Sequence, residues 1–296
     1  MENSLCGAVF RSEKRLAEKT ALLSPRTRRA SPLTAGKDAS MSVTLKVCTF
    51  NLRVEASVDG INHFSNRKGR ILETIRNENP DLIGFQEVND NMRAWLLDAI
   101  PEYVVVGCGR GKDYLGECTL IAFRKHAFEM ITLDNFWLSM SPRIPGSRFG
   151  ADQSSCPRIA TAALLKHRKA SEPFYFINTH LDHKGSAARL HGSIELLQFI
   201  SEKSEGVILT GDMNAHPDAP EIKVITDCEF RKLADITCHI DGTFHGFGTR
   251  EKMSKIDYIF TDMKADPKKS YAVEDIPVDG LYISDHRPVI GFVTVE

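Results

Sequence analysis

Four short segments of the 296-residue chain contain polar side chains whose types could hold a metal ion or move a proton. Each segment closes an apolar run typical of a buried strand, and α/β folds collect functional polar groups at strand ends. The segments are Cys48–Arg53, Ile83–Val88, Leu209–Pro217 and Ser284–Val289. Their oxygen-rich side chains, together with a histidine, indicate a hard divalent cation and hydrolytic chemistry.

Three of these side chains are suited to binding the cation. Hydrolysis of a phosphodiester requires that charge developing around phosphorus be neutralised and that a water be oriented and deprotonated. Asn51, Glu87 and Asp285 offer oxygen ligands of the kind that Mg²⁺ accepts, and Mn²⁺ is an alternative. We therefore expect a metal site at these three residues.

A second set of side chains could act on the water and on the phosphate. Asp212 and Asn214 lie two residues apart, so one could polarise the water while the other donates to a phosphate oxygen. His286 is the natural proton acceptor, and Asp257 is the carboxylate that could orient it. His180 also ends an apolar run and could bind the phosphate or protonate the leaving oxygen.

The intervening pattern predicts many strands and few long helices. Helical periodicity covers residues 67–79 and 186–203, and a third helix is expected after residue 217, with Asp218 as its cap and Pro220 in its first turn. Strands are predicted at residues 45–50, 82–85, 103–106, 120–123, 161–165, 174–179, 206–210, 258–260 and 289–295. This interleaving favours two sheets packed face to face with helices outside, in one domain over residues 41–296.

Composition sets the remaining expectations. The formal net charge is −1, so no global basic field attracts nucleic acid, although bound cations could supply positive charge locally. The seven cysteines show no zinc-binding spacing, and no apolar stretch is long enough for a transmembrane segment. We expect reduced thiols and a monomeric, intracellular, cytoplasmic protein. Residues 1–40 have four more basic than acidic side chains and predict a disordered extension, with organelle targeting as the alternative.

The ordered motifs FNLR, FQEV, NTHLD, GDMNAHP, KIDYIF and SDHRPV resemble those of the endonuclease/exonuclease/phosphatase superfamily, whose members are DNase-I-like. The resemblance implies a four-layer α/β/β/α sandwich with two mixed sheets and a site at one edge of them. It also implies that Asn51 and Glu87 lie at the metal and that Asp285 lies near it. Asp212 and Asn214 would then lie at the scissile phosphate, with Asp257 behind His286.

Finer features resemble a bacterial and fungal subgroup of uncharacterised members. This likeness suggests five substrate contacts, for which structural ion pairing is the alternative role: Arg110, Glu117, Arg158, Asp182 and Arg189. The subgroup usually has tryptophan where this chain has Phe64, and again near Phe149. Because these rings are absent here, the subgroup does not indicate which side chains of this chain line the rim that faces the substrate.

Three functions remain open at this stage. The first is a Mg²⁺-dependent phosphodiesterase or nuclease that cleaves a nucleic acid or nucleotide by in-line water attack. The second is a phosphomonoesterase acting on an inositol phosphate or another small phosphorylated molecule. The third is a catalytically silent binding protein on the same fold, which the complete set of polar motif residues disfavours.

Overall fold

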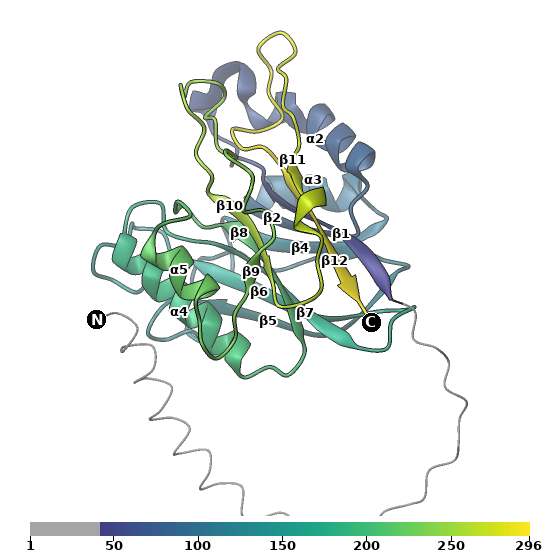
Figure 1. The fold of residues 1–296 in the computed structure, drawn as a ribbon. Helices are drawn as coiled ribbons and strands as arrows, with labels where there is room; N and C mark the ends of the chain where they lie inside the picture. Colours follow the sequence, from purple (N-terminus) through teal and green to yellow (C-terminus); the bar gives the residue numbers. More distant parts are fainter. Residues whose placement is uncertain (1–41) are drawn as a thin grey trace, which may run out of the picture. The chain divides into compact units, whose positions relative to one another are not determined.

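The computed structural model describes residues 42–296, whose strands form two six-stranded mixed sheets (Figure 1). The first sheet has the order β11–β12–β1–β2–β4–β3, with β1 (Val43–Asn51), β2 (Leu82–Val88), β3 (Tyr103–Val106), β4 (Cys118–Arg124), β11 (Tyr271–Ala272) and β12 (Val289–Val295). The second has the order β5–β6–β7–β8–β10–β9, with β5 (Phe128–Trp137), β6 (Ile159–His167), β7 (Pro173–His180), β8 (Gly206–Asp212), β9 (Ala234–Asp235) and β10 (Asp257–Thr261). The helices are α2 (Phe64–Glu78), α3 (Asp90–Ala99), α4 (Ser186–Ser201) and α5 (Pro220–Thr226), with short 3₁₀ turns η1 (Ser57–Asn62) and η2 (Pro267–Lys269). The extension predicted over residues 1–40 lies outside the described residues and stays a prediction.

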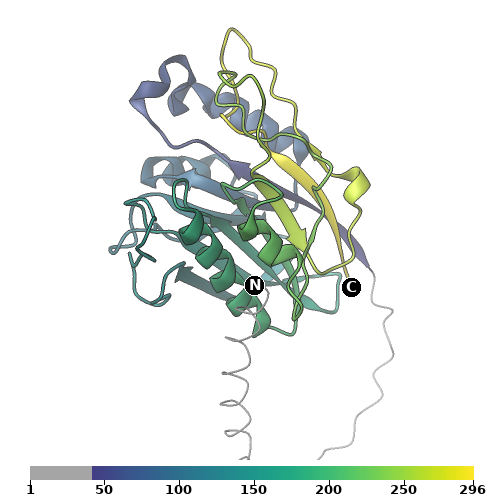
Figure 2. The same cartoon turned by 60° about the vertical axis from the view of Figure 1, so that its left-hand side comes forward.

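The first sheet buries both of its faces, because successive side chains of a strand point to opposite sides. Val47 of β1 packs in a cluster with Phe174 of the second sheet. Its neighbour Cys48 belongs to another cluster, which contains Ile71 of α2 and Met92 of α3. These two helices therefore cover the outer face of the first sheet (Figure 2).

The second sheet repeats this arrangement on its own side. Ile208 of β8 belongs to the cluster between the sheets, whereas Leu209 packs with Leu196 of α4 and Ile222 of α5. Helices α4 and α5 therefore cover the outer face of the second sheet. The result is the four-layer α/β/β/α sandwich with two mixed sheets, which confirms the predicted fold class.

The two longest helices agree with the sequence pattern. The prediction over residues 67–79 corresponds to α2, which begins at Phe64, where the ring of His63 accepts a hydrogen bond from Ser65 N. It ends before Asn79, whose φ of 46° is left-handed and which precedes Pro80. The prediction over residues 186–203 corresponds to α4, two residues shorter at its carboxyl end.

The predicted cap of the third helix is wrong. Pro220 does lie in the first turn of α5, but the N-cap residue is Ala219, which makes no side-chain hydrogen bond. Asp218 lies one position too early to cap, and its fully exposed carboxylate is 3.8 Å from Lys223 Nζ. The helix therefore begins on the fixed backbone of proline and without a polar cap.

The sequence pattern did not predict helix α3 or strand β5. Helix α3 begins where Asn89 accepts a hydrogen bond from Met92 N, 2.9 Å away. Strand β5 is an edge strand whose residues 129–133 are all exposed, so its sequence lacks the alternation that reveals a half-buried strand. Within residues 42–296 no helix is both long and apolar enough to cross a membrane.

Strand register brings the polar strand ends together. In the first sheet, parallel pairing of β1 with β2 places Asn51 beside Gln86, the residue before Glu87. In the second sheet, parallel pairing of β7 with β8 places His180 beside Asp212, and antiparallel β10 places Asp257 on the other side of Asp212.

A buried polar network ties the two sheets together beneath these strand ends. Asn178 of β7 donates to the carbonyl oxygens of Phe85 and Leu120 in the first sheet, at 2.8 and 2.9 Å. Its own Oδ1 accepts from Gln86 Nε2 at 2.7 Å. Gly84 is required beside this network, since a Cβ there would lie 2.2 Å from Thr210 Oγ1. The network fixes one sheet against the other, because buried polar groups need their partners.

Candidate active site

His286 and two aspartates form one buried part of the site. His286 is 4% exposed, and its Nδ1 lies 2.9 Å from Asp257 Oδ2. Its Nε2 lies 3.7 Å from Asp212 Oδ2 on the opposite side of the ring. The Asp257 carboxylate therefore fixes one nitrogen of the ring and leaves Nε2 directed into the site.

The loop before β10 holds this pair in register. Thr243 Oγ1 accepts from Asp257 N at 3.2 Å, and Thr243 O accepts from Arg287 N at 2.6 Å. Phe244 packs its ring against the His286 imidazole, with centroids 4.7 Å apart. Thr243 and Phe244 thus contact both Asp257 and the segment that carries His286. The orientation of the imidazole therefore does not depend on a single hydrogen bond.

Asp212 lies at the centre of the second-sheet half of the site. One oxygen accepts from Asn214 N at 2.9 Å, and the other accepts from Asn51 Nδ2 at 3.0 Å. Asn214 donates through Nδ2 to Leu181 O at 3.1 Å and lies 3.0 Å from His180 Nε2. The backbone of Asn214 is left-handed, with φ of 48°, which turns its side chain back toward β7.

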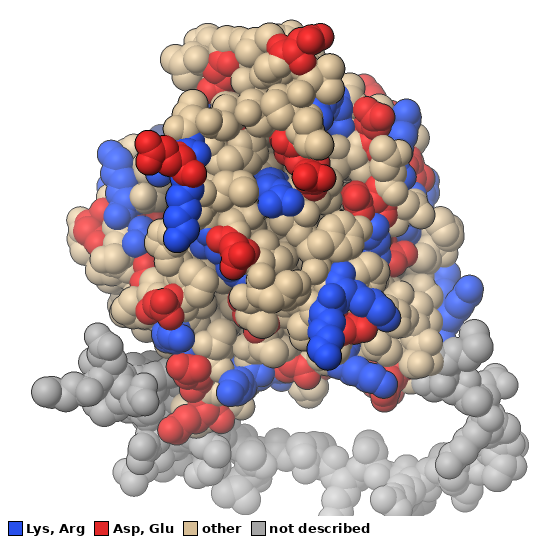
Figure 3. Space-filling view, turned by 45° about the horizontal axis from the view of Figure 1, so that its top comes forward, with Lys and Arg blue, Asp and Glu red and all other residues tan. Residues whose placement is uncertain are grey.

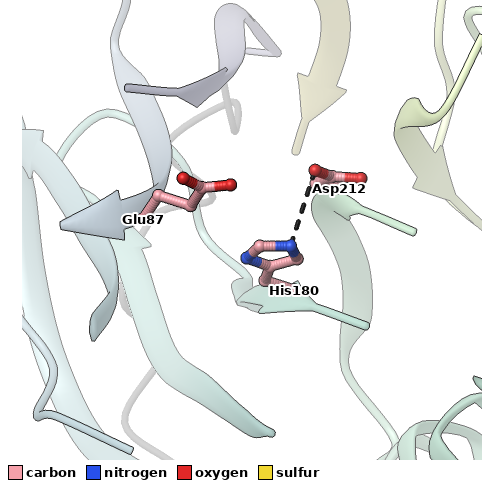
Figure 4. A group of neighbouring side chains, drawn as sticks. All are labelled: Glu87, His180 and Asp212. Carbon is pink, nitrogen blue, oxygen red and sulfur yellow. Dashed lines mark ion pairs between the residues drawn. The ribbon is translucent and has the colours of Figure 1, made fainter. Parts of the chain in front are cut away.

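His180 lies between the two sheets' carboxylates, with Asp212 on one side and Glu87 on the other (Figure 4). The Nε2 atom of His180 is 3.6 Å from Asp212 Oδ2. Ligand atoms of these three residues lie within 4.8 Å of one another, and those of Asp212, Asp257 and His286 form a second such group. The two groups share Asp212.

The first sheet contributes Glu87, Asp285 and Asn51. Glu87 has a left-handed backbone, with φ of 60°, and its carboxylate accepts from Val54 N at 2.9 Å and from Asn51 Nδ2 at 3.2 Å. Ser284, next to Asp285, donates through Oγ to Asn51 O at 2.7 Å, which ties the SDHRPV segment to the end of β1. The three predicted metal ligands thus belong to one corner of the first sheet.

The amide of Asn51 is oriented in a definite way. Its Nδ2 faces the carboxylates of Glu87 and Asp212, whereas its Oδ1 accepts from Arg53 N at 2.9 Å. A metal held by Glu87 and Asn51 would need this amide turned over, so that its oxygen and not its nitrogen faces Glu87.

Arg53 is a site residue that sequence analysis did not single out. Its guanidinium lies 3.9 Å from both Glu87 and Asp285 and is paired with Asp59 at 3.0 Å. Its backbone is also left-handed, with φ of 55°, an uncommon conformation for a residue other than glycine. Its place in the FNLR motif, directly after the strand that ends in Asn51, was the available signal.

Arg67 was also missed as a residue that shapes the site. It is fully buried, and its guanidinium donates to the carbonyl oxygens of Asn62, Leu52, Arg53 and Ile283 at 2.6 to 2.9 Å. It therefore joins the segment after Asn51 to the segment before Asp285. Burial lowers the pKa of Arg67 to about 10, against the attraction of nearby carboxylates, so the group stays charged at neutral pH.

The packing of carboxylates shifts the proton affinities of the site. Burial and, to a lesser degree, the neighbouring Asp257 carboxylate raise the pKa of Asp212 to about 7. Burial likewise raises the pKa of Asp285. Burial alone would lower the pKa of His286, but the Asp257 and Asp212 carboxylates outweigh it and raise that pKa well above its ordinary value. Such crowding of like charges is what a bound dication relieves.

The five predicted substrate contacts fall into two sets. Arg110, Glu117 and Arg158 line a small cavity that also has Glu87 and His180 in its wall. Asp182 is 2% exposed and accepts hydrogen bonds from the backbone N–H groups of Ser154, Lys184 and Gly185. Arg189 pairs with Glu221 at 2.6 Å and donates to Asp182 O at 3.1 Å. The contacts of the last two residues organise the loop after β7.

The match to known proteins covers the whole of this site. A family model described as the Endonuclease/Exonuclease/phosphatase family matches residues 48–286. The chain belongs to the endonuclease/exonuclease/phosphatase family. This confirms the family predicted from the motifs, and its members act on phosphoesters.

Solved structures of family members share the fold. An endonuclease/exonuclease/phosphatase protein from Bacteroides vulgatus is 30% identical, with a TM-score of 0.79 over 86% of this chain and 100% of that chain. The mannosyl-6-phosphatase of Bacteroides thetaiotaomicron is 25% identical, with a TM-score of 0.75 over 85% of this chain and 100% of that chain. TDP2 from D. rerio, complexed with a single-strand DNA product, is 17% identical, with a TM-score of 0.65 over 86% of this chain and 99% of that chain, a likeness of fold alone.

Proposed function

We propose that this protein is a Mg²⁺-dependent phosphoesterase that hydrolyses its substrate by in-line attack of water. The observation that carries the proposal is the geometry of His286, whose Nδ1 is bonded to Asp257 while its Nε2 faces Asp212. A histidine held in this way can accept a proton from water, and the charge it gains is stabilised by the buried carboxylate.

The residues fit a hard divalent cation. Glu87 and Asp285 would hold it, with Asn51 as a third ligand after its amide turns over. Burial, together with neighbouring carboxylates, raises the pKa of both Asp212 and Asp285, and this supports the proposal because a bound cation would stabilise their ionised forms. When bound, Mg²⁺ would neutralise charge on the phosphate oxygens and on the leaving oxygen. Mn²⁺ would be an alternative with the same ligands.

The chain's own residues would perform the proton transfer and the positioning. Asp212 would orient the water, His286 Nε2 would take its proton, and Asp257 would hold the resulting imidazolium. Asn214 and His180 would contact the phosphate oxygens. Burial, with Arg158 and Arg110 nearby, keeps the pKa of His180 well below its ordinary value, so we assign it hydrogen bonding to phosphate and not proton donation.

Two observations bear on the class of ester. The mannosyl-6-phosphatase at 25% identity acts, by its name, on a sugar phosphate. On the face drawn in Figure 3, lysines and arginines of residues 42–296 are interspersed with acidic residues and form no continuous basic band. Tight binding of a long nucleic acid relies on such bands. We therefore propose a phosphomonoester of a small molecule as the leading substrate class, although the sequence alone favoured a phosphodiester.

A nucleic acid or nucleotide phosphodiester is the second candidate. The observation in its favour is the DNA-bound TDP2 structure, in which the same fold holds a single-strand DNA product. A short strand or a nucleotide would need fewer basic contacts than a long duplex.

A comparison of two chromogenic esters tests the proposal. With Mg²⁺ we expect hydrolysis of p-nitrophenyl phosphate, loss of activity in EDTA, and recovery when Mg²⁺ or Mn²⁺ is restored. A preference for bis-(p-nitrophenyl) phosphate would move the assignment to a phosphodiesterase. The absence of hydrolysis of both esters with either metal would contradict the proposed function.

A further inference from the structure

The small cavity beside the site has one wall that the proposed chemistry does not use. Glu87 and His180 form the side that faces the reacting phosphate, and Arg110, Glu117 and Arg158 form the rest of its polar lining. In the proposed mechanism the phosphate is bound beside Glu87 and His180, so an alcohol group esterified to it could extend into this cavity.

Arg158 presents an unpaired donor at this cavity. The residue is 4% exposed and precedes β6, where its backbone O accepts from Leu138 N at 2.8 Å. Its Nη2 lies 2.8 Å from His183 Nδ1, and its Nε lies 3.4 Å from Asp182 Oδ2. Its Nη1 is buried and has no hydrogen-bond partner among residues 42–296. A buried N–H group left unpaired is costly, and such an atom in a cavity wall indicates a ligand or a water.

Glu117 presents an acceptor at the same cavity. Its Oε1 accepts from Arg110 Nη2 at 2.5 Å, and no hydrogen bond is found for its Oε2 within the described part of the chain. The two residues stand at the ends of one loop, which is closed by a hydrogen bond from Arg110 N to Glu117 O of 3.0 Å. Trp137 Nε1 holds the same loop by donating to Arg110 O at 2.7 Å. The acceptor is thus preformed and does not wait for a ligand.

The balance of charge selects the kind of ligand. Arg110 is matched by Glu117 and Arg158 by Asp182, so the wall has no surplus positive charge for a second phosphate. It does combine an unpaired N–H donor with a carboxylate acceptor. A hydroxyl group both accepts and donates, and it is the group that satisfies such a pair.

We propose that this cavity is a subsite for one hydroxyl group of the alcohol part of the substrate, bound between Arg158 and Glu117. The substrate would then be a phosphate ester of an alcohol that carries at least one further hydroxyl group, as a sugar does. This inference rests on the proposed function, because the alcohol is located by its ester at Glu87 and His180.

The test compares two monophosphates that differ in their hydroxyl groups. Wild-type protein with Mg²⁺ should hydrolyse a hexose 6-phosphate with a kcat/KM at least about tenfold higher than that for 1-hexyl phosphate, since a site built for a hydroxyl rejects an analogue without it. Glu117→Met, which keeps volume but removes the acceptor, should bring the two values within about threefold of each other. The variant should lower the kcat/KM for the hexose 6-phosphate and leave the kcat/KM for 1-hexyl phosphate unchanged.

The matched control is Asp262→Asn. Asp262 pairs with Arg231 at 2.6 Å, and the side chains in that pair are 21% and 16% exposed, close to the 23% and 16% of Glu117 and Arg110. Asp262 accepts from Val207 at the start of β8, the end opposite Asp212. This variant should keep the wild-type preference.

If Glu117→Met fails to fold, Arg158→Lys decides the matter, because it keeps the charge and removes the planar fork that carries Nη1. Dissociation constants of both esters for His286→Ala provide a readout that needs no turnover, and they should show the same preference.

Equal wild-type kcat/KM values for the two esters, or equal losses of kcat/KM on both esters in the variants, would overturn the subsite and leave the phosphoesterase proposal standing. Faster hydrolysis of a hexose bisphosphate than of the monophosphate would also overturn it, in favour of an anion subsite. If wild-type protein hydrolyses no ester with either metal, the proposed function fails first.

Discussion

The two sheets contribute different chemistry to one site. The first sheet and its flanking turns supply Glu87, Asp285 and Asn51, whose oxygens are proposed to hold a cation. The second sheet supplies His180, Asp212 and Asp257, which are proposed to act on the phosphate and on the proton. His286 is the exception, because it precedes β12 of the first sheet but bonds to Asp257 of the second. Neither half is complete alone, and the packing of the sheets brings the halves into one site.

The halves also differ in how they are stabilised. In the second sheet, pairing of β8 with β7 and with β10 sets His180 and Asp257 on either side of Asp212. In the first sheet, the segments that carry Asn51 and Asp285 are joined by the carbonyl contacts of Arg67. We infer that strand register fixes His180, Asp212 and Asp257, which we call the catalytic half. The metal half, which is Asn51, Glu87 and Asp285, also needs the buried guanidinium of Arg67, because register places Asn51 near Glu87 but does not place Asp285.

The largest loss should come from the metal half. Glu87→Gln removes an anionic ligand and keeps the volume, so kcat should fall by several orders of magnitude while the unfolding midpoint changes little. Glu78→Gln is the matched control, because Glu78 is 19% exposed against 16% for Glu87 and pairs with Lys46 at the other end of β1. That control should retain full activity. Near wild-type turnover of Glu87→Gln at saturating Mg²⁺ would mean that the metal site is wrongly assigned.

A smaller effect should follow from loosening the metal half without touching a ligand. Arg67→Met leaves four carbonyl oxygens without their donor, and it should lower the free energy of unfolding by roughly 3 to 5 kcal/mol. At temperatures where the variant is folded, the Mg²⁺ concentration for half-maximal activity should rise about tenfold or more, with a smaller change in kcat. Chemical denaturation and Mg²⁺ titration measure the two effects. A loss of stability with an unchanged Mg²⁺ requirement would make Arg67 a structural residue only.

The sequence predicts the fold well where polar residues end apolar strands. Runs such as 206–210, which ends two residues before Asp212, mark both a buried strand and a site residue, so one signal located both. Helix caps were less certain, as Asp218 shows, because α5 begins at Pro220, two residues beyond Asp218, and Ala219 takes the N-cap position. Strand β5 escaped prediction because an exposed edge strand carries no alternating pattern.

The sequence does not reveal contacts that depend on loops. Arg67 and Arg53 shape the metal half through carbonyl and carboxylate groups that are distant along the chain, up to Ile283 and Asp285. Arg110 and Glu117 were suspected as substrate contacts from the family likeness, and the structure adds that they pair with each other across one loop. Such pairings follow from tertiary packing, and no local pattern encodes them.

The most direct test of the central claim is a double-mutant cycle on Asp257 and His286. Residues that act as a unit lose function non-additively, so His286→Ala should nearly abolish activity, Asp257→Asn should lower it strongly, and the double variant should be little worse than His286→Ala alone. In the wild-type protein kcat/KM should fall as the pH is lowered through the pKa of His286, which the Asp257 and Asp212 carboxylates hold above its ordinary value despite burial, because protonated His286 can no longer accept a proton from water. That acidic limb should be absent from whatever activity His286→Ala retains. Multiplicative losses in the double variant, or an acidic limb that persists without His286, would contradict the pairing and move the role of base to Asp212.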